Sequence, residues 1–420
     1  MNIKRVRRIA APLVAGALAL GALSGTGEAR TATPQPARWT AAWGASPQLP
    51  STGFTPNWSQ EGFSHQSVRQ VVRVTQGGER VRIRLSNAYG TSPLKVTGAT
   101  VARARKGGGP SVEAGSVRHL TFGGKRSVEV PARGELRSDA VGLRLARLEP
   151  VTVTLYFAGT TGPATFHSQG WTDTYRAEGD RRGDVSGAGF RAKTQSWYYL
   201  SGVEVSGGRG GGRGDGGVVV FGDSITDGFG STPNTDRRYS DVLAERTGRP
   251  VVNQGIGGNL VLNDSAWYGE RGTARFARDV LDQPGASTVV ILEGLNDIGF
   301  SETDRQPTYK PAPVVSSGEL INGYREMIRL ARGKGLRVVG ATLLPLKGSD
   351  HWGTRAARVS DEVNEWIRGS GEFDAVVDLD RVMADAGDRD RLDPAYDFGD
   401  ALHPNDAGYR AMAEAVAAVL

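Results

Sequence analysis

The sequence predicts an α/β domain built on a five-stranded, doubly wound parallel sheet, preceded by an all-β sandwich domain. Three observations lead to this fold class. Residues 39–205 carry short segments in which apolar and polar residues alternate, which is the pattern of half-buried strands. From residue 218 onward, short apolar segments alternate with longer amphipathic ones, which is the pattern of βαβ units. A glycine-rich stretch separates the two regions.

The first 29 residues have the pattern of a secretory signal peptide. Four basic residues lie between positions 4 and 8, an apolar run covers residues 9–23, and small residues follow it. The run contains Pro12 and is short for a membrane span, so an uncleaved anchor is the alternative. Arg7-Arg8 leaves the twin-arginine export route open beside the general one. We therefore expect a secreted protein without stable membrane insertion.

Composition indicates where the domains and the linker between them lie. Residues 30–206 are expected to form the β-sandwich accessory domain, and residues 218–420 the α/β domain. Residues 207–217 are almost entirely Gly and Arg, which is typical of a flexible linker.

Charge and cysteine content exclude several classes of function. The formal net charge of +6 falls to about +3 without residues 1–29, and no basic stripe interleaved with aromatic residues occurs. Nucleic-acid binding is therefore not expected. The chain has no cysteine, so disulfides, thiolate metal sites and cysteine nucleophiles are excluded.

In the first region, Ser67–Thr75 and Arg80–Ser86 both alternate apolar and polar residues around a connection with two glycines. This spacing predicts a hairpin with one buried face. Arginines at its outward positions predict a solvated sheet face, with an acidic-polymer surface as the alternative. They are Arg69, Arg73, Arg82 and Arg84. Further strands are expected at Leu94–Ala102, Val117–Phe122, Ser127–Val130, Val141–Leu145 and Val151–Phe157.

Aromatic residues gather at the start of the same region. We expect core or interdomain packing, and a platform that stacks on sugars is the alternative. The residues are Trp39, Trp43, Phe54, Trp58 and Phe63.

The second region alternates strands and helices. Its expected strands are Val218–Phe221, Val251–Asn253, Thr288–Leu292, Leu336–Thr342 and Ala375–Leu379. Its expected helices lie near Tyr239–Thr247, Ala274–Leu281, Glu319–Arg332, Arg355–Arg368 and Ala407–Val419. Asn405 is the expected N-cap of the last helix.

A serine follows the first of these strands. Gly222-Asp223-Ser224 abruptly ends the apolar run Val218–Phe221, which is typical of a strand covered on both faces. A residue at the carboxyl end of such a strand lies where open α/β sheets bind ligands. We therefore expect Ser224 to be a nucleophile. Asp223 and Asp227 are expected only to bond nearby turn amides.

A serine nucleophile needs a base held by an acid. Of the five histidines, only His351 and His403 lie in the second region, and Asp400 precedes His403 by three residues. In a tight loop a carboxylate at this spacing reaches the nearer ring nitrogen and fixes the tautomer. We therefore expect His403 to be the base and Asp400 its partner, with His351 as the fallback base.

Oxyanion donors are expected after the second and third strands. Gly258 lies in a glycine-rich turn, where backbone N–H groups can approach a ligand closely. Asn296 follows the third strand and can donate its side-chain amide to the same oxygen. The backbone N–H of Ser224 completes the expected oxyanion hole.

This ordered set resembles the SGNH/GDSL hydrolase superfamily over residues 218–420, through its four signature blocks. The blocks are Gly222-Asp223-Ser224-Ile225, with Ile where the family name has Leu, Gly258, Gly294-Leu295-Asn296-Asp297 and Asp400-Ala401-Leu402-His403. No Gly-x-Ser-x-Gly elbow occurs, which argues against the separate α/β-hydrolase fold. The resemblance implies a flavodoxin-like esterase domain that needs no metal or cofactor.

The resemblance also assigns roles. It implies that Ser224 attacks, that His403 is general base and then general acid, that Asp400 orients His403, and that Gly258 and Asn296 join the Ser224 amide in the oxyanion hole. The whole chain is similar to a secreted bacterial branch of arylesterases and acylhydrolases, some associated with xylan degradation. In that branch a β module that opens with Trp-x-x-x-Trp precedes the hydrolase domain, as Trp39 and Trp43 do here.

We therefore expect a secreted serine carboxylic ester hydrolase that forms an acyl-enzyme. Acetylated polysaccharide or another short-acyl ester is the expected substrate. A lipase or arylesterase acting on lipid or aryl esters is the alternative, and a carbohydrate-binding surface protein with an inactive hydrolase domain is an alternative of another class.

Overall fold

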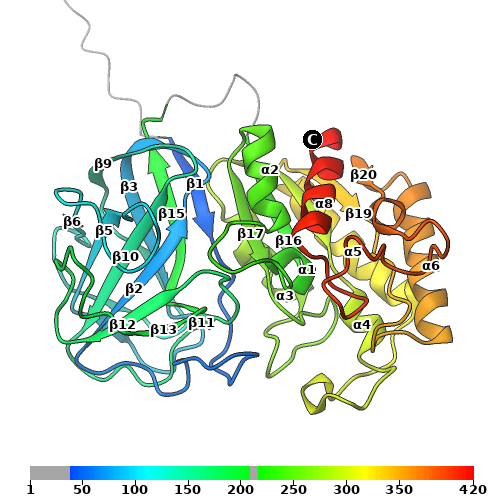
Figure 1. The fold of residues 1–420 in the computed structure, drawn as a ribbon, viewed down its shortest axis with the longest axis horizontal. Coiled ribbons are helices and arrows are strands. Elements are labelled where there is room, and N and C mark those ends of the chain that lie inside the picture. The colour runs from blue at the N-terminus through cyan, green and yellow to red at the C-terminus, as the bar shows by residue number, and fades with distance from the viewer. Residues whose placement is uncertain (1–37, 209–215) are drawn as a thin grey trace, which may run out of the picture. The chain divides into compact units, whose positions relative to one another are not determined.

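The structure is a computed structural model and describes residues 38–208 and 216–420. The expected signal peptide and most of the expected linker lie outside the described residues. The elements of both regions appear in Figure 1, and the described residues form one compact unit.

Five parallel strands form the sheet of the C-terminal region, in the order β17-β16-β18-β19-β20. Their bounds are β16 (Gly217–Gly222), β17 (Val251–Gly255), β18 (Ala286–Leu292), β19 (Arg337–Ala341) and β20 (Ala375–Val377). In register, Val220 of β16 lies between Asn253 and Val290 of its two neighbours. The chain runs from β16 outward to β17 and then crosses to β18, so the strand order reverses at β16. The predicted doubly wound fold class is confirmed, and β16 lies at the switch point where such sheets bind ligands.

Helices connect these strands. They are α1 (Ser224–Asp227), α2 (Tyr239–Thr247), α3 (Gly272–Phe276), a π-helical turn (Ala277–Leu281), α4 (Leu295–Gly299), a 3₁₀ turn (Pro307–Tyr309), α5 (Ser317–Gly333), α6 (Thr354–Gly369), α7 (Leu379–Met383) and α8 (Asp406–Val419). Helix α2 packs against α8, and α5 packs against both α3 and α6. The Asn405 side chain accepts hydrogen bonds from the N–H groups of Ala407 and Gly408, so it caps α8 as expected.

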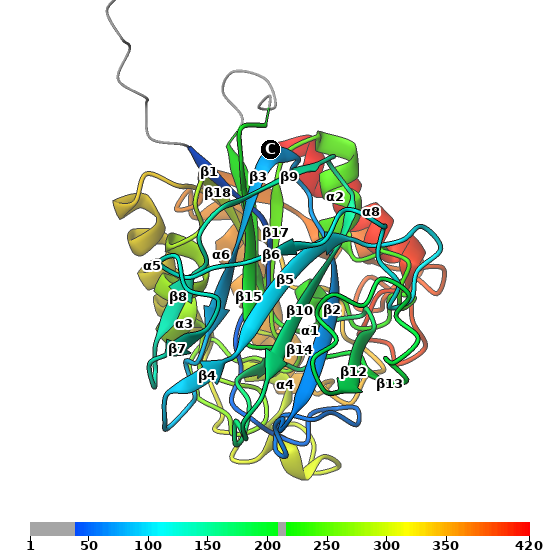
Figure 2. The same cartoon turned by 90° about the vertical axis from the view of Figure 1, so that its left-hand side faces the viewer.

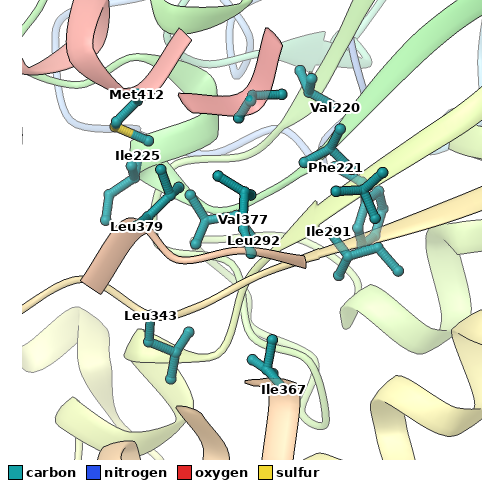
Figure 3. Close-up of a cluster of buried hydrophobic side chains, with 14 of the residues drawn as sticks. Val220, Phe221, Ile225, Ile291, Leu292, Leu343, Ile367, Val377, Leu379 and Met412 are labelled. Carbon is teal, nitrogen blue, oxygen red and sulfur yellow. The ribbon is translucent and has the colours of Figure 1, made fainter. Parts of the chain in front are cut away.

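Apolar side chains cover both faces of the sheet. In Figure 3, Met412 of α8 and Ile367 of α6 lie on opposite sides of Leu292 and Val377, which belong to the sheet. All four side chains are buried. The near-continuous apolar runs of the strands are explained by this double cover, because neither face meets water.

Residues 39–206 fold into antiparallel strands joined by loops, and this region faces the viewer in Figure 2. One sheet has the order β1-β15-β3-β8 with β9 beside β3, another the order β13-β12-β2-β10-β5-β6, and two short pairs are β11-β14 and β4-β7. Buried residues of the two larger sheets share one hydrophobic core. The strands are β1 (Trp39–Gly44), β2 (Gln66–Arg73), β3 (Gly78–Ser86), β4 (Leu94–Val96), β5 (Gly98–Arg103), β6 (Arg118–His119), β7 (Val128–Val130), β8 (Glu135–Arg137), β9 (Val141–Leu145), β10 (Pro150–Phe157), β11 (Phe166–His167), β12 (Thr174–Glu178), β13 (Ala192–Thr194), β14 (Trp197–Tyr198) and β15 (Leu200–Ser206).

The predicted hairpin of β2 and β3 is wrong, because the two strands lie in different sheets. Their connection crosses between the sheets, and Thr75 anchors it. The Thr75 N–H donates to the Ala42 carbonyl over 2.7 Å, and its hydroxyl donates to the Val251 carbonyl over 2.9 Å. Apolar and polar residues alternate along each strand because one face of the strand lies against the core shared by the two sheets. That alternation does not reveal which neighbouring strand each one pairs with.

The predicted solvated arginine face is also wrong for two of its four residues. Arg69 and Arg84 are buried. The Arg69 guanidinium donates to the Thr154 hydroxyl and the Pro110 carbonyl, and it lies 4.1 Å from the centroid of the Phe190 ring. Loops cover this face of β2, so the arginine forms neither a solvated face nor a surface for an acidic polymer.

The aromatic cluster divides between two roles. Trp43, Trp58 and Phe63 are buried in the core of the N-terminal region, as the packing interpretation predicts. Phe54 is 45% exposed and belongs to the functional site described below.

Hydrogen bonds join the N-terminal strands to the edge of the parallel sheet. The Ala41 N–H donates to the Pro284 carbonyl over 2.8 Å, and the Ser46 hydroxyl donates to the Gln254 side chain over 2.7 Å. Both contacts lie close to β17, the edge strand next to β16. The N-terminal region is therefore part of the structure that supports the switch point. Within the described residues, no helix has the length and apolar character that a membrane span requires.

Candidate active site

Ser224 lies at the switch point of the parallel sheet. It is the first residue of α1, directly after β16, and it is buried. Asp223 caps this short helix, and its carboxylate accepts the Ile225 N–H over 3.0 Å. The role expected for Asp223, bonding a turn amide, is therefore the one the structure has.

A hydrogen-bonded chain connects Ser224 to the C-terminal loop. The Ser224 Oγ lies 2.8 Å from His403 Nε2, and His403 Nδ1 lies 2.7 Å from Asp400 Oδ2. The other Asp400 oxygen accepts the backbone N–H groups of His403 and Leu402. Ala401, between them, has φ +59°, which makes the tight turn. The Asp-x-x-His spacing thus brings the carboxylate to the nearer ring nitrogen, as the sequence predicts.

This arrangement suits proton transfer. Partial burial favours the neutral form of Asp400, but the hydrogen bond and charge of His403 outweigh it and lower the pKa of Asp400. An ionised Asp400 selects the tautomer of His403 that carries its proton on Nδ1. The Nε2 lone pair then faces the Ser224 hydroxyl and can accept its proton.

The expected oxyanion donors line the same cavity as Ser224. Gly258 has φ +76°, and a Cβ there would lie 2.4 Å from the Tyr268 ring, so only glycine fits. The Asn296 side-chain amide donates one N–H to the Asn259 carbonyl over 2.9 Å, which leaves its second N–H for a ligand. Among the described residues, the N–H groups of Ser224 and Gly258 have no hydrogen-bond acceptor. These donors have the chemistry needed to bind a developing oxyanion.

A fully buried arginine forms hydrogen bonds to the strand ends and the loop that carry these donors. The Arg275 guanidinium donates to the Gly222 carbonyl over 2.9 Å, to the Gln254 carbonyl over 2.7 Å and to Asn259 Oδ1 over 2.7 Å. Asp279 and Glu293 are its buried anionic partners, at 3.2 and 3.4 Å. One side chain therefore holds the ends of β16 and β17 and the loop that carries Gly258.

The N-terminal region also contacts the loops around Ser224 and Gly258. His167 Nε2 lies 3.1 Å from Asp227 Oδ1, and both side chains are buried. The other Asp227 oxygen accepts the Gly257 N–H over 3.0 Å. Asp227 therefore does more than the expected bonding of nearby turn amides, because it connects β11 to the loop that presents Gly258.

A cavity of about 640 Å³ opens over Ser224. This volume is typical of a small-molecule site. Polar side chains at its wall include Arg305, Gln306 and Thr308. Six aromatic rings also line the cavity, and they are Phe54, Phe229, Trp267, Tyr268, Phe300 and Tyr309.

His351, the fallback base, does not contact Ser224 in the hydrogen-bond network. Its Nε2 lies 3.1 Å from Asn296 Oδ1 and its Nδ1 lies 2.6 Å from Asp350 Oδ1. The base expected from the sequence, His403, is the histidine that the structure brings to Ser224. Within residues 38–208 and 216–420, no group of three or more acidic or histidine side chains could hold a metal ion.

Sequence reasoning missed three contributors to the site, which are Arg275, His167 and Asp350, and it named Phe54 only as one of an aromatic cluster. Arg275 lies in a segment correctly predicted to be helical, but no local pattern marks an arginine that a fold will bury. His167 and Phe54 lie far from Ser224 in sequence, so only the packing of the two regions places them beside it. The adjacent pair Asp350-His351 was a usable signal, since it is a second carboxylate beside a second histidine.

The C-terminal region matches a known family model. Residues 220–411 match the model of the GDSL-like Lipase/Acylhydrolase family. Similar solved structures include a GDSL-like lipase from Bacteroides thetaiotaomicron VPI-5482, with 21% identity over 48% of this chain and 85% of that chain and a TM-score of 0.36. A carbohydrate acetylesterase from Sinorhizobium meliloti has 16% identity over 49% of this chain and 97% of that chain, with a TM-score of 0.37. An inhibitor-bound aryl esterase from M. smegmatis has 17% identity over 49% of this chain and 100% of that chain, with a TM-score of 0.36. A comparison with curated proteins gives no match.

Asp223, next to the serine, generates a prediction about stability and pH. Burial first, and then the nearby Glu293 carboxylate, raises the pKa of Asp223 from 3.8 to about 8. The folded state therefore binds a proton that the unfolded state releases between about pH 4 and pH 8. The contribution of protonated Asp223 to the free energy of unfolding is fully present below about pH 4 and is lost as the pH rises to about 8. Asp223→Asn keeps a capping oxygen but cannot ionise.

We expect the free energy of unfolding of Asp223→Asn, relative to wild type, to rise with pH across this window. The steepest slope is about 1.4 kcal/mol per pH unit. Urea unfolding of both proteins at pH 5, 6.5 and 8 measures it. Two parallel pH profiles would show that Asp223 is ionised in the folded protein.

Proposed function

Residues 220–411 of this chain belong to the GDSL-like lipase/acylhydrolase family, so the protein is a carboxylic ester hydrolase, and we propose that it works through an acyl-enzyme formed on Ser224. One observation carries the proposal. The Ser224 hydroxyl, the His403 ring and the Asp400 carboxylate form an unbroken hydrogen-bonded chain at the floor of the cavity. This intact chain argues against an inactive domain that only binds carbohydrate.

Each of these groups takes part in one or more steps of the proposed hydrolysis. His403 Nε2 accepts the proton of Ser224 as Oγ attacks the ester carbonyl carbon. The carbonyl oxygen becomes an oxyanion, which accepts from the N–H groups of Ser224 and Gly258 and from the Asn296 amide. His403 then gives its proton to the leaving alcohol oxygen, and the C–O bond breaks. A water molecule, deprotonated by His403, hydrolyses the acyl-enzyme and restores Ser224.

We propose a short-acyl ester of a ring-bearing alcohol as the substrate, and acetylated polysaccharide as the natural source. The support is the mixed character of the cavity wall. Its aromatic rings can stack on the C–H face of a sugar, while Gln306 and Thr308 can bond to hydroxyl groups. The S. meliloti structure is that of a carbohydrate acetylesterase.

An aryl ester is the second candidate, and the same observation favours it. Phe54 and Tyr268 are stacked with ring centroids 5.3 Å apart, and Phe300 and Tyr309 with centroids 3.9 Å apart. Walls of this kind pack against an aryl group as well as against a sugar.

We also propose that the protein is exported. The support is the basic and apolar pattern of residues 1–29. Expression of the full chain in a secreting bacterial host, followed by mass spectrometry, tests it. A protein in the medium that begins near residue 30 is the expected result, and uncleaved protein retained in the cells would contradict it.

Hydrolysis of p-nitrophenyl esters tests the nucleophile and the acyl preference together. We expect wild type to cleave acetate and butyrate esters with the highest kcat/KM, and Ser224→Ala to lose at least about 10³-fold in kcat because no other hydroxyl can form the acyl-enzyme. Ser370→Ala, beyond the far end of α6, is the matched control and should keep wild-type activity.

Two results would overturn the assignment. Equal rates for Ser224→Ala and wild type would remove Ser224 as the nucleophile. A kcat/KM that increases to the longest acyl chains would identify a lipase and contradict the short-acyl substrate.

Phe54 tests whether the N-terminal region helps to bind substrate. Phe54→Ala removes a wall of the cavity but no group that touches the reacting atoms. We expect KM for p-nitrophenyl acetate to increase by about 3-fold or more with little change in kcat, since the lost contact is equal in the ground and transition states. Leu49→Ala, an exposed residue of the same region outside the cavity wall, should leave KM unchanged. An unchanged KM for Phe54→Ala would exclude this wall from the binding site.

A further inference from the structure

A second histidine–aspartate pair lies in the wall of the cavity, beside the oxyanion donor. His351 is 1% exposed. Its Nδ1 lies 2.6 Å from Asp350 Oδ1, and its Nε2 lies 3.1 Å from Asn296 Oδ1. The site therefore has two such pairs. One ends on the nucleophile Ser224 and the other on Asn296.

The orientation of the Asn296 amide follows from its other contact. Its nitrogen lies 2.9 Å from the Asn259 carbonyl oxygen, which can only accept a hydrogen bond. Nδ2 must face that carbonyl, so Oδ1 must face His351. The hydrogen bond between them therefore needs a proton on His351 Nε2.

The proton count then fixes the charge of the ring. With Nε2 protonated, a neutral His351 would direct the lone pair of Nδ1 at the Asp350 carboxylate. An imidazolium avoids this repulsion and donates to an acceptor on each side. The hydrogen bond from His351 lowers the pKa of Asp350, which favours the ionised carboxylate.

Packing holds the ring in this position. A Cβ on Gly299 would lie 2.1 Å from the imidazole, so the absence of a side chain there makes room for His351. The Phe300 and Tyr309 rings pack against it at centroid distances of 5.5 and 5.7 Å, and the Tyr309 hydroxyl donates to Asp350 over 3.3 Å. These contacts hold the ring in place, so it can fix the amide that it contacts.

We propose that His351, held as an imidazolium by Asp350, is a positioning residue that orients and polarises Asn296 for oxyanion binding. Donation to Oδ1 draws electron density from the amide and strengthens the N–H of Nδ2 that faces the cavity. The inference rests on the proposed function, since it assumes that Asn296 binds the oxyanion.

A double-mutant cycle tests this role with p-nitrophenyl acetate. Asn296→Ala is expected to lower kcat by about 10²–10³-fold. His351→Ala is expected to lower kcat by about 10-fold or more with little change in KM, because polarisation of Asn296 matters most in the transition state. In the Asn296→Ala background, His351→Ala should change kcat by less than about 2-fold. His351→Gln retains an N–H donor and should recover part of the loss, and His65→Gln, an exposed histidine, is the matched control.

The outcomes separate the two proposals. If Asn296→Ala lowers kcat and the effect of His351→Ala is the same in both backgrounds, the proposed function stands and the role of His351 is refuted. If Asn296→Ala leaves kcat unchanged, the oxyanion assignment itself fails and the inference fails with it.

A variant at Asp350 keeps the test valid if His351→Ala does not fold, as judged by circular dichroism. Asp350 is partly exposed, so Asp350→Asn changes little packing. It removes the carboxylate that holds the ring charged. We expect Asp350→Asn to lower kcat on its own and to have little further effect on kcat in the Asn296→Ala background. An Asp350→Asn enzyme with wild-type kcat would overturn the inference.

Discussion

The site depends on one buried guanidinium. Arg275 has no exposed surface, and its donors hold the end of β16, the end of β17 and the loop that carries Gly258. A buried cation is costly unless carboxylates and hydrogen bonds compensate it, and Asp279, Glu293 and the strand-end carbonyls do so here. Because these carbonyls already have a donor, the N–H groups of the same loops can face the cavity. The arginine thus fixes the geometry in which Ser224 and Gly258 meet a substrate.

The N-terminal region is integrated into the same support. Its Ser46 hydroxyl lies beside Arg275 and Gln254, and its His167 lies against Asp227, which in turn holds the Gly257 N–H. Phe54 of this region forms part of the cavity wall. Through these contacts, the β region and the α/β domain together form the surroundings of Ser224. The β region contributes hydrogen bonds to the loops around Ser224, and its Phe54 forms part of the cavity wall.

Much of this could be predicted from the sequence, because the relevant signals are local. The apolar run before Gly222-Asp223-Ser224 predicted β16 and the position of Ser224, and the Asp400-x-x-His403 spacing predicted a contact that one tight turn produces. The rest depends on distant packing. Alternation in Ser67–Thr75 showed which face is buried, but not that β2 would pair with β10 and β12 instead of β3. Likewise, nothing near Arg69 or Arg275 in sequence indicates the loops and strand ends that bury them.

We propose above all that Ser224 is a nucleophile activated by His403 and Asp400. Inactivation by a fluorophosphonate, followed by mass spectrometry of the digested protein, tests this most directly, because the probe bonds only to an activated hydroxyl. We expect one adduct per chain, on the peptide that contains Ser224, and labelling that slows markedly in His403→Ala. An adduct on another residue, or equally fast labelling of His403→Ala, would contradict it.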